Sequence, residues 1–236
     1  SVLFNAGELA INLVTYRESF EAYADGSWLG AAQGWTPGGV GQVTGDVAMA
    51  SALTAWGSAF PIETTHDQVL KITDEIADEI QSDTGGQLYT DCMLYMVGRV
   101  DPPEGKADYQ VAFYLNTNEQ VVVWHEGTSS NEWLTLTGSS VSTSAWHRFT
   151  VKQDQSNFRF QLFVDGSIAP LSDAAGYASR TGTNQGGAWF KMVNKSGSLS
   201  RMRVLGGAVD TPSYLDDLVV TQSTPEYLTS TLFLFR

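Results

Sequence analysis

Cysteine and basic residues are both scarce in this chain of 236 residues. The single cysteine, Cys92, excludes an intrachain disulfide. Its place in the apolar stretch LYTDCMLYMV predicts a small buried core residue, with a catalytic or interchain thiol as the alternative. The 13 Lys and Arg residues against 26 Asp and Glu give a net charge of −13. Nucleic acids and anionic membrane surfaces are themselves negative and attract positively charged proteins. We therefore expect no nucleic-acid partner.

Long apolar runs are missing as well. No stretch reaches the ~18 apolar residues that a membrane-spanning helix needs, so we predict no membrane span. The chain starts at Ser1 without an initiator methionine, and it combines low charge with many Gly, Ser, Thr and aromatic residues. We expect an exported protein, extracellular or at the cell surface, whose leader has been removed.

Motifs for catalysis and cofactor binding are also absent. No phosphate-binding loop, dinucleotide fingerprint or Gly-x-Ser-x-Gly elbow occurs, although a Ser-His-Asp set assembled by the fold stays open. His66, His125 and His147 do not lie at metal-ligand spacing from one another. Glu75 and Asp78 in DEIADEI are three residues apart and would face opposite sides of a strand, whereas retaining glycoside hydrolysis needs two carboxyl groups ~5 Å apart. We predict no catalytic residues and no enzymatic activity.

Short strand-like stretches separated by turn residues fill most of the chain. The strongest are, in chain order, 87–100, 109–126, 158–171 and 213–221. The second has NTNE at a hairpin turn, and the third has Asp165-Gly166. Residues 42–56 show strand-like alternation, and 66–82 reads as a strand followed by a short helix or bend. The pattern predicts an all-β antiparallel sandwich or barrel.

Period-two alternation indicates which side chains share a face of two of these strands. In the first, residues 158–164, the apolar face consists of Phe158, Phe160, Leu162 and Val164. In the second, residues 214–221, strict alternation places Leu215, Asp217, Val219 and Thr221 opposite Tyr214, Asp216, Leu218 and Val220. One face of each strand can line the space between two sheets.

Three stretches carry a family resemblance: ESFEAYADGSWLGAAQGW at 18–35, AWHRFTVKQDQSNFRFQLFVDG at 145–166 and YLDDLVVT at 214–221. They resemble the concanavalin-A-like, laminin-G-type jelly-roll domains of secreted bacterial proteins. The resemblance implies an antiparallel two-sheet jelly-roll sandwich over residues 18–222. Residues 1–17 and 223–236 are then extra N- and C-terminal strand extensions. Because this fold carries lectins, glycosidases, lyases and structural modules, the resemblance leaves the function open.

Two kinds of binding site are predicted. Jelly rolls of this type often bind one structural calcium ion between the first and last strands, and the acidic residues that match by resemblance are Glu21, Asp25, Asp216 and Asp217. A turn role for Asp25 and an edge position for Asp216 are the alternatives. Indole rings stack on sugars, and the glycan-binding candidates are Trp28, Trp124 and Trp133. Trp133 is the strongest because it lies in the polar stretch SSNEWL, with core packing as the alternative for the set.

The two terminal extensions are apolar and alternate like strands. Their predicted assembly residues are Leu9, Ile11, Leu13, Tyr227, Leu232, Phe233, Leu234 and Phe235. These segments either complete their own sandwich or add a strand to another copy of the chain, and a head-to-tail contact of that kind builds a filament. The main hypothesis is a non-catalytic extracellular structural protein that self-assembles into a filament or sheath. A carbohydrate-binding module is the alternative, and a glycosidase or lyase is the least favoured.

Overall fold

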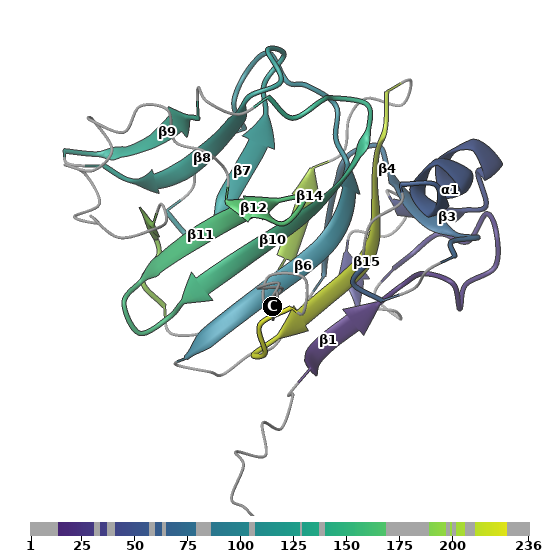
Figure 1. Ribbon diagram of the computed structural model, residues 1–236, viewed down its shortest axis with the longest axis horizontal. Helices are drawn as coiled ribbons and strands as arrows, with labels where there is room; N and C mark the ends of the chain where they lie inside the picture. Colours follow the sequence, from purple (N-terminus) through teal and green to yellow (C-terminus); the bar gives the residue numbers. More distant parts are fainter. Residues whose placement is uncertain are drawn as a thin grey trace, which may run out of the picture.

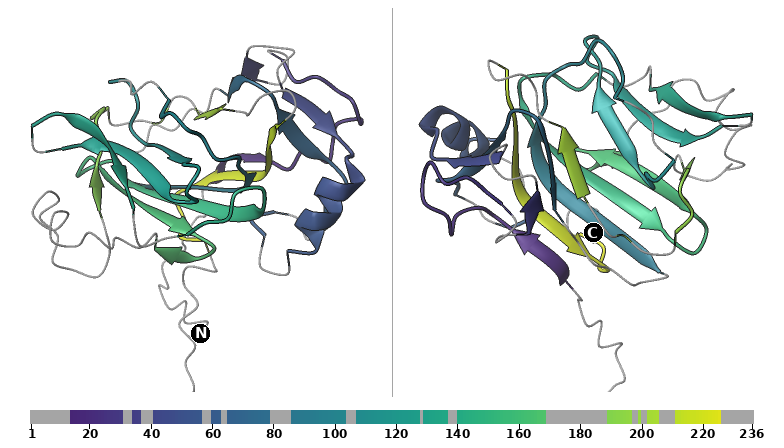
Figure 2. Two further views of the ribbon diagram at one scale, coloured as in Figure 1. Left: turned by 90° about the horizontal axis from the view of Figure 1, so that it is seen from above. Right: turned by 180° about the vertical axis from the view of Figure 1, so that it is seen from behind.

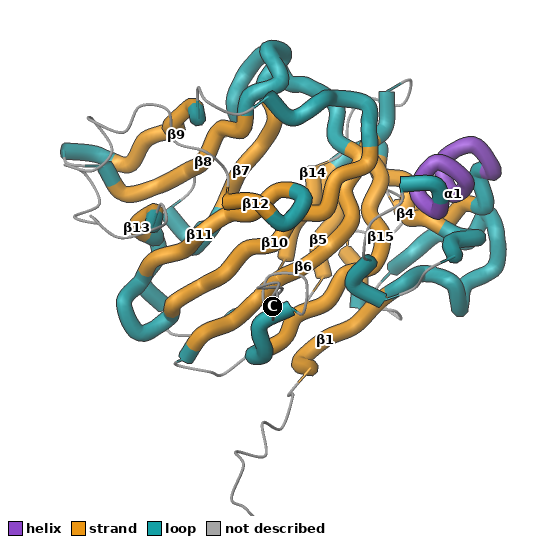
Figure 3. Tube along the Cα trace, in the orientation of Figure 1, coloured by secondary structure: helices purple, strands orange, loops and turns teal. Residues whose placement is uncertain are grey.

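β-Strands provide nearly all the regular structure in the computed structural model of the chain, which is drawn by element type in Figure 3. The described residues are 14–30, 34–36, 41–56, 60–62, 65–78, 86–103, 107–127, 129–136, 140–168, 189–196, 199, 202–205 and 211–225. The terminal residues predicted to carry assembly, namely Leu9, Ile11, Leu13 and those from Tyr227 to Phe235, lie outside this set.

The elements follow one another in a simple order. The strands are β1 (Val14–Glu18), β2 (Trp35–Thr36), β3 (Gly41–Thr44), β4 (Val69–Ile72), β5 (Glu75–Asp78), β6 (Gln87–Tyr95), β7 (Ala112–Leu115), β8 (Val121–Glu126), β9 (Asn131–Thr135), β10 (Trp146–Asp154), β11 (Arg159–Val164), β12 (Ser167–Ile168), β13 (Phe190–Lys191), β14 (Met202–Leu205) and β15 (Ser213–Thr221). Helix α1 (Val47–Thr54) lies between β3 and β4.

A nine-stranded antiparallel sheet forms one layer of the fold (Figure 1). Its order is β12-β11-β10-β6-β15-β4-β3, with β13 paired to β11 and β1 sharing one edge of β15 with β4. Two three-stranded antiparallel sheets, β7-β8-β9 and β14-β5-β2, form the second layer on one side of it (Figure 2). Phe113 of β7 stacks on Phe149 of β10 at 5.2 Å between ring centroids, and fully buried Trp35 of β2 belongs to the same core. The predicted all-β antiparallel sandwich is confirmed.

The two predicted hairpins are present. In the β11–β12 turn, Asp165 and Gly166 have φ of 50° and 79°, the two left-handed residues of a type I′ turn that matches strand twist. Phe160 and Leu162 of β11 are buried in the core, as the alternation predicts. In the β7–β8 turn, the Asn116 carboxamide oxygen accepts backbone hydrogen bonds at 2.9 and 3.0 Å, which fixes the predicted NTNE loop.

The last strand departs from the predicted alternation. Between Asp216 and Val219, β15 carries one more residue than β6 opposite it, which is a β-bulge. Asp217 lies in this bulge with φ of 50°, a left-handed conformation that Asp adopts more readily than most residues. Leu215 and Leu218 consequently both enter the core, although they are three residues apart. The strict alternation predicted for 214–221 is therefore wrong.

Helix α1 replaces the strand pattern predicted for residues 42–56. Strand β3 forms as expected, but the Asp46 carboxylate then accepts hydrogen bonds from two backbone N–H groups of the first turn, at 3.1 and 3.3 Å. Met49 and Leu53, four residues apart on this helix, pack on Trp146, on the face of the large sheet away from the main core. Full burial of Leu53 stabilises this docking by about 1.5–3 kcal/mol. The packing of α1 on the sheet thus overrides the local alternation.

The N-terminal strand belongs to the large sheet. β1 runs across the predicted domain boundary at 17/18 and pairs with β15 of the same chain through Val14↔Thr221 and Glu18↔Leu218. Over 66–82, where the sequence predicts a strand followed by a helix or bend, the structure has β4, a bend at 73–74 and β5. Cys92 is 3% exposed, so the buried core role is confirmed. No helix in the described part of the chain is long and apolar enough to cross a membrane.

Candidate functional site

Three aromatic side chains gather on the outer face of the β7-β8-β9 sheet. Trp124 of β8 lies directly opposite Trp133 of β9, and their ring centroids are 5.2 Å apart with planes inclined at 48°. Tyr114 of β7 meets Trp133 edge-on, also at 5.2 Å. Val121 and Val123, which alternate with Trp124 along β8, are fully buried in the core. The aromatic side chains therefore point away from the core of the sandwich.

Polar groups border this aromatic face. Glu126 lies two residues beyond Trp124 on β8, on the same side of the strand, and faces Asn131 across the sheet. The Lys195 ammonium donates to the Glu126 carboxylate at 2.9 Å. Burial raises the pKa of Tyr114 and outweighs the nearby Arg99 guanidinium, so its hydroxyl stays protonated at neutral pH. The face thus combines partly exposed indole rings with hydrogen-bonding and charged groups at its border.

Trp28 does not join this group. Trp28 is 54% exposed, and its backbone pairs with Gln42 of β3. β3 is the edge strand at the α1 end of the large sheet, whereas β7-β8-β9 covers the β10–β11 end (Figure 1). Of the three predicted glycan-binding tryptophans, the structure brings together Trp124 and Trp133. Tyr114, which the sequence analysis missed, joins them because β7 lies beside β8.

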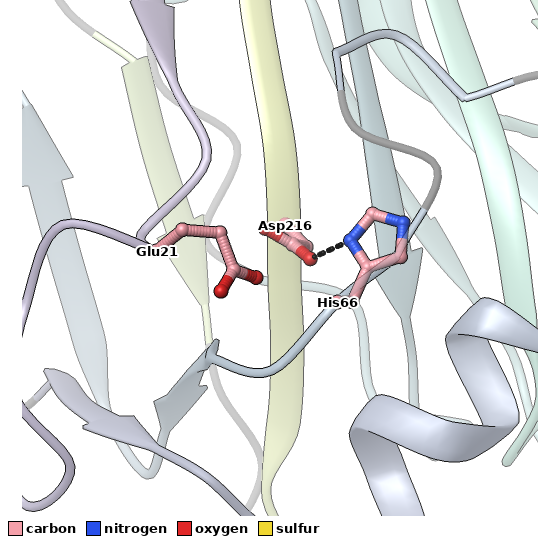
Figure 4. A group of neighbouring side chains, drawn as sticks. All are labelled: Glu21, His66 and Asp216. Atoms are coloured by element: carbon pink, nitrogen blue, oxygen red, sulfur yellow. Dashed lines mark hydrogen bonds and ion pairs between the residues drawn. The ribbon is translucent and has the colours of Figure 1, made fainter.

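A second cluster consists of Glu21, His66 and Asp216 (Figure 4). Glu21 follows β1, His66 precedes β4, and Asp216 belongs to β15. The His66 Nδ1 and the Asp216 Oδ2 are 2.8 Å apart, and both side chains are fully buried. One potential ligand atom from each of the three residues lies within 4.8 Å of the others. The sequence could not indicate His66, because it is 150 residues from Asp216 and forms no spacing motif with it.

The four acidic residues predicted to bind calcium accept hydrogen bonds from backbone N–H groups. Glu21 accepts from residues 67 and 68 at 3.0 and 3.1 Å, and Asp25 accepts from residue 45 at 2.8 Å. Asp216 accepts from residue 217 at 2.8 Å, and Asp217 accepts from residue 62 at 3.1 Å. Glu21 and Asp217 therefore hold the segment before β4, whereas Asp25 holds the turn after β3 and Asp216 binds the next residue of its own strand, structural roles that need no ion.

The three-residue cluster fits calcium poorly. Calcium takes six to eight oxygen ligands, whereas this group supplies an imidazole nitrogen and two carboxylates already engaged with protein groups. A nitrogen and two carboxylates suit a transition ion such as Zn²⁺ better. Asp25 and Asp217 are not members of the group. The calcium site stays a prediction, which the change in Tm on adding calcium to chelator-treated protein will check.

Comparisons with known proteins give distant structural likenesses. No protein-family model matches the chain, and no curated protein matches it. The T. cruzi calreticulin globular domain is similar at 12% identity, over 92% of this chain and 90% of that chain, with a TM-score of 0.46. Domain 4 of AbnA, a GH43 extracellular arabinanase from Geobacillus stearothermophilus, in complex with arabinotriose, is similar at 15% identity. The match covers 92% of this chain and 97% of that chain, with a TM-score of 0.45. The endo-1,3-beta-glucanase from Streptomyces sioyaensis is similar at 16% identity, over 95% of this chain and 100% of that chain, with a TM-score of 0.36. Because these TM-scores are below 0.5, no function is taken from these proteins.

Proposed function

We propose that this chain is a carbohydrate-binding module that uses the aromatic face formed by Tyr114, Trp124 and Trp133. The observation that carries the proposal is the cross-strand pair of Trp124 and Trp133 on the outer side of a sheet whose inner side already fills the core. Trp124 and Trp133 are partly exposed, whereas Tyr114 is buried beside them. Apolar and aromatic patches that stay exposed at a surface mark interaction sites. An indole ring stacks on the C–H face of a sugar, and the polar groups around it accept and donate hydrogen bonds to hydroxyl groups.

Charge narrows the class of sugar. With a net charge of −13, the protein repels polysaccharides that carry carboxylate or sulfate groups. At the border of the aromatic face, the positive charge of Lys195 is paired with Glu126. We therefore expect neutral glycans, whose rings expose unsubstituted C–H faces for stacking, to bind better than acidic ones.

Binding to a panel of neutral and acidic polysaccharides, measured by affinity electrophoresis and calorimetry, tests the proposal. Loss of one stacking ring costs about 1.4 kcal/mol or more, so Trp133→Ala should weaken binding at least about tenfold. Trp28→Ala is the matched control, since Trp28 is more exposed but stands apart from the aromatic face. Circular dichroism will show that both variants fold. The proposed function loses its support if the wild type binds none of the polysaccharides, or if Trp133→Ala binds them as tightly as the wild type does.

The filament hypothesis is a separate proposal. The strands that would carry it lie outside the described residues, and β1 pairs within its own chain. Contact between copies of the chain and an extracellular location stay predictions, and the absence of enzymatic activity expected from the sequence is untested. Deletion of residues 226–236 distinguishes the two roles of that segment: a soluble folded monomer is expected for a strand donated to another copy, and an unfolded protein for a strand of its own sandwich.

A further inference from the structure

Ser142, His147 and Asp165 form a continuous chain of hydrogen bonds at the surface, at one end of β10. The Ser142 Oγ and the His147 Nε2 are 3.0 Å apart, and the His147 Nδ1 and the Asp165 Oδ2 are 2.7 Å apart. His147 lies on β10, Asp165 in the β11–β12 turn, and Ser142 in the segment before β10. The side chain of His147 is 15% exposed, whereas Ser142 is exposed to solvent.

The carboxylate of Asp165 is held in place from two sides. Its Oδ1 accepts a hydrogen bond from the backbone N–H of Arg148 at 2.9 Å, and its own N–H donates to the Arg148 carbonyl at 2.9 Å. The type I′ turn with Gly166 fixes the backbone of Asp165. Oδ2 of Asp165 is thereby directed to the imidazole of His147. In a Ser-His-Asp triad, it is this carboxylate that selects the tautomer of the imidazole ring.

The segment that carries Ser142 is also anchored. The N–H of Thr143 donates to the Glu119 carboxylate at 3.2 Å, and the N–H of Ser144 donates to the Met96 carbonyl at 3.0 Å. Ser144 has φ of 60°, so the chain turns sharply between Ser142 and β10. These backbone contacts of residues 143 and 144 hold the segment in place. The Ser142 hydroxyl is not used to anchor the segment and lies next to the imidazole.

Both protonation states of the His147 ring have partners in this arrangement. With Nδ1–H donating to Asp165, the Nε2 lone pair accepts the hydroxyl hydrogen of Ser142. Once Nε2 carries a proton, the Ser142 carbonyl oxygen lies 3.2 Å from it and accepts the new hydrogen bond. A base that gains a hydrogen-bond acceptor on taking a proton, beside a fixed carboxylate, is suited to general base catalysis.

We propose that Ser142 is a nucleophile activated by His147 and Asp165, and that the site hydrolyses carboxylic esters. The Ser142 Oγ forms a bond to the ester carbonyl carbon while His147 Nε2 takes its proton. The carbon–oxygen bond to the leaving alcohol then breaks, and His147 returns the proton to that alcohol. Water attacks the acyl-serine with His147 again as the base, which releases the carboxylic acid and regenerates the Ser142 hydroxyl.

The position of the site sets the class of ester. Ser142 is exposed and the Asp165 side chain is 40% exposed, so an ester that projects from a larger molecule can reach the hydroxyl. A short acyl group, such as acetyl, needs no deep pocket. The esterase activity does not depend on the aromatic face, since Ser142, His147 and Asp165 do not belong to that face.

Labelling with a biotinylated fluorophosphonate tests the proposal on the intact chain. The serine oxygen bonds to phosphorus, fluoride leaves, and the proton goes to the base, so the adduct reports an activated serine directly. Tryptic mass spectrometry should find the adduct on Ser142, and Ser142→Ala should lose it. Ser140→Ala is the matched control, because Ser140 is an exposed serine in the same segment that contacts Glu119 and not His147. That control should label like the wild type.

Asp165→Asn separates activation from mere exposure. Asn-Gly suits a type I′ turn, so the fold is expected to persist. The amide lacks the charge that stabilises the protonated ring, and the labelling rate at Ser142 should fall about 100-fold or more. The wild type should hydrolyse 4-nitrophenyl acetate. The rate of this hydrolysis should fall in parallel with labelling in Ser142→Ala and Asp165→Asn. The proposal is overturned if the wild type gives no adduct under conditions that fully label a known serine esterase, or if Asp165→Asn labels at the wild-type rate.

Discussion

Replacing Asp91 by asparagine should destabilise the fold by about 3 kcal/mol, at the lower end of the range for breaking a buried ion pair. Asp91 of β6 and Arg148 of β10 lie side by side on the face of the large sheet away from the main core, and their side chains are 3% and 5% exposed. The Arg148 Nε donates to Asp91 Oδ1 at 3.0 Å, and its Nη2 donates to Oδ2. The Thr150 hydroxyl donates to Oδ1 at 2.8 Å.

The magnitude follows from these contacts. An asparagine side chain keeps one acceptor oxygen but places an NH₂ group where the second carboxylate oxygen was, so one guanidinium N–H faces another donor. Loss of one hydrogen bond to a charged group costs about 1.5–3 kcal/mol. Weaker compensation of the buried Arg148 charge adds to this, which brings the sum to about 3 kcal/mol.

Urea denaturation followed by tryptophan fluorescence measures the effect. With a slope of about 3 kcal/mol per molar urea, the midpoint should move down by about 1 M. The double variant Asp91→Leu with Arg148→Met removes both charges and should recover most of the loss, because a buried pair replaced by apolar groups is often neutral. A midpoint for Asp91→Asn within error of the wild type would refute the reasoning, as would a double variant less stable than the single one.

Two further predictions concern ionisable groups. Burial raises the pKa of the Cys92 thiol, so Ellman's reagent should react with it at pH 8 only after unfolding in guanidinium, and rapid reaction of the native protein would contradict its place in the core. Burial also acts to raise the pKa of Asp154, but hydrogen bonds from Asn157 and Arg159 outweigh it and leave the pKa below its ordinary value near 3.8. A carboxyl group whose folded pKa is depressed contributes stability above its unfolded pKa and loses it as the pH falls through the folded value. Asp154→Asn should therefore flatten the decline of the unfolding free energy below about pH 4, and an unchanged pH profile from denaturation curves would exclude this contribution.

The sequence determined the fold class because period-two alternation and turn residues act over a few neighbouring positions. Residues 158–166 contain both signals, and the hairpin that they form has the predicted apolar face and the predicted Asp165-Gly166 turn. Local patterns failed where a distant contact overrode them. Leu53 is buried on Trp146, 93 positions further along the chain, and this contact favours α1 over the strand that 42–56 indicates. The bulge at Asp217 likewise depends on the partner strand β6, which has one residue fewer opposite it.

The candidate sites were accessible to the sequence only in part. Trp124 and Trp133 were candidates because indole rings stack on sugars, and Trp133 in addition lies in a polar stretch, but their pairing required the register between β8 and β9. The neighbours of His66 and His147 were not identifiable, since no spacing motif links His66 to Asp216, 150 residues away, or His147 to Asp165, 18 residues away. Composition and alternation thus determined an acidic, all-β chain with one buried cysteine. Which side chains face one another was decided by sheet register and loop anchoring, because strand pairing brings together groups that are distant in sequence.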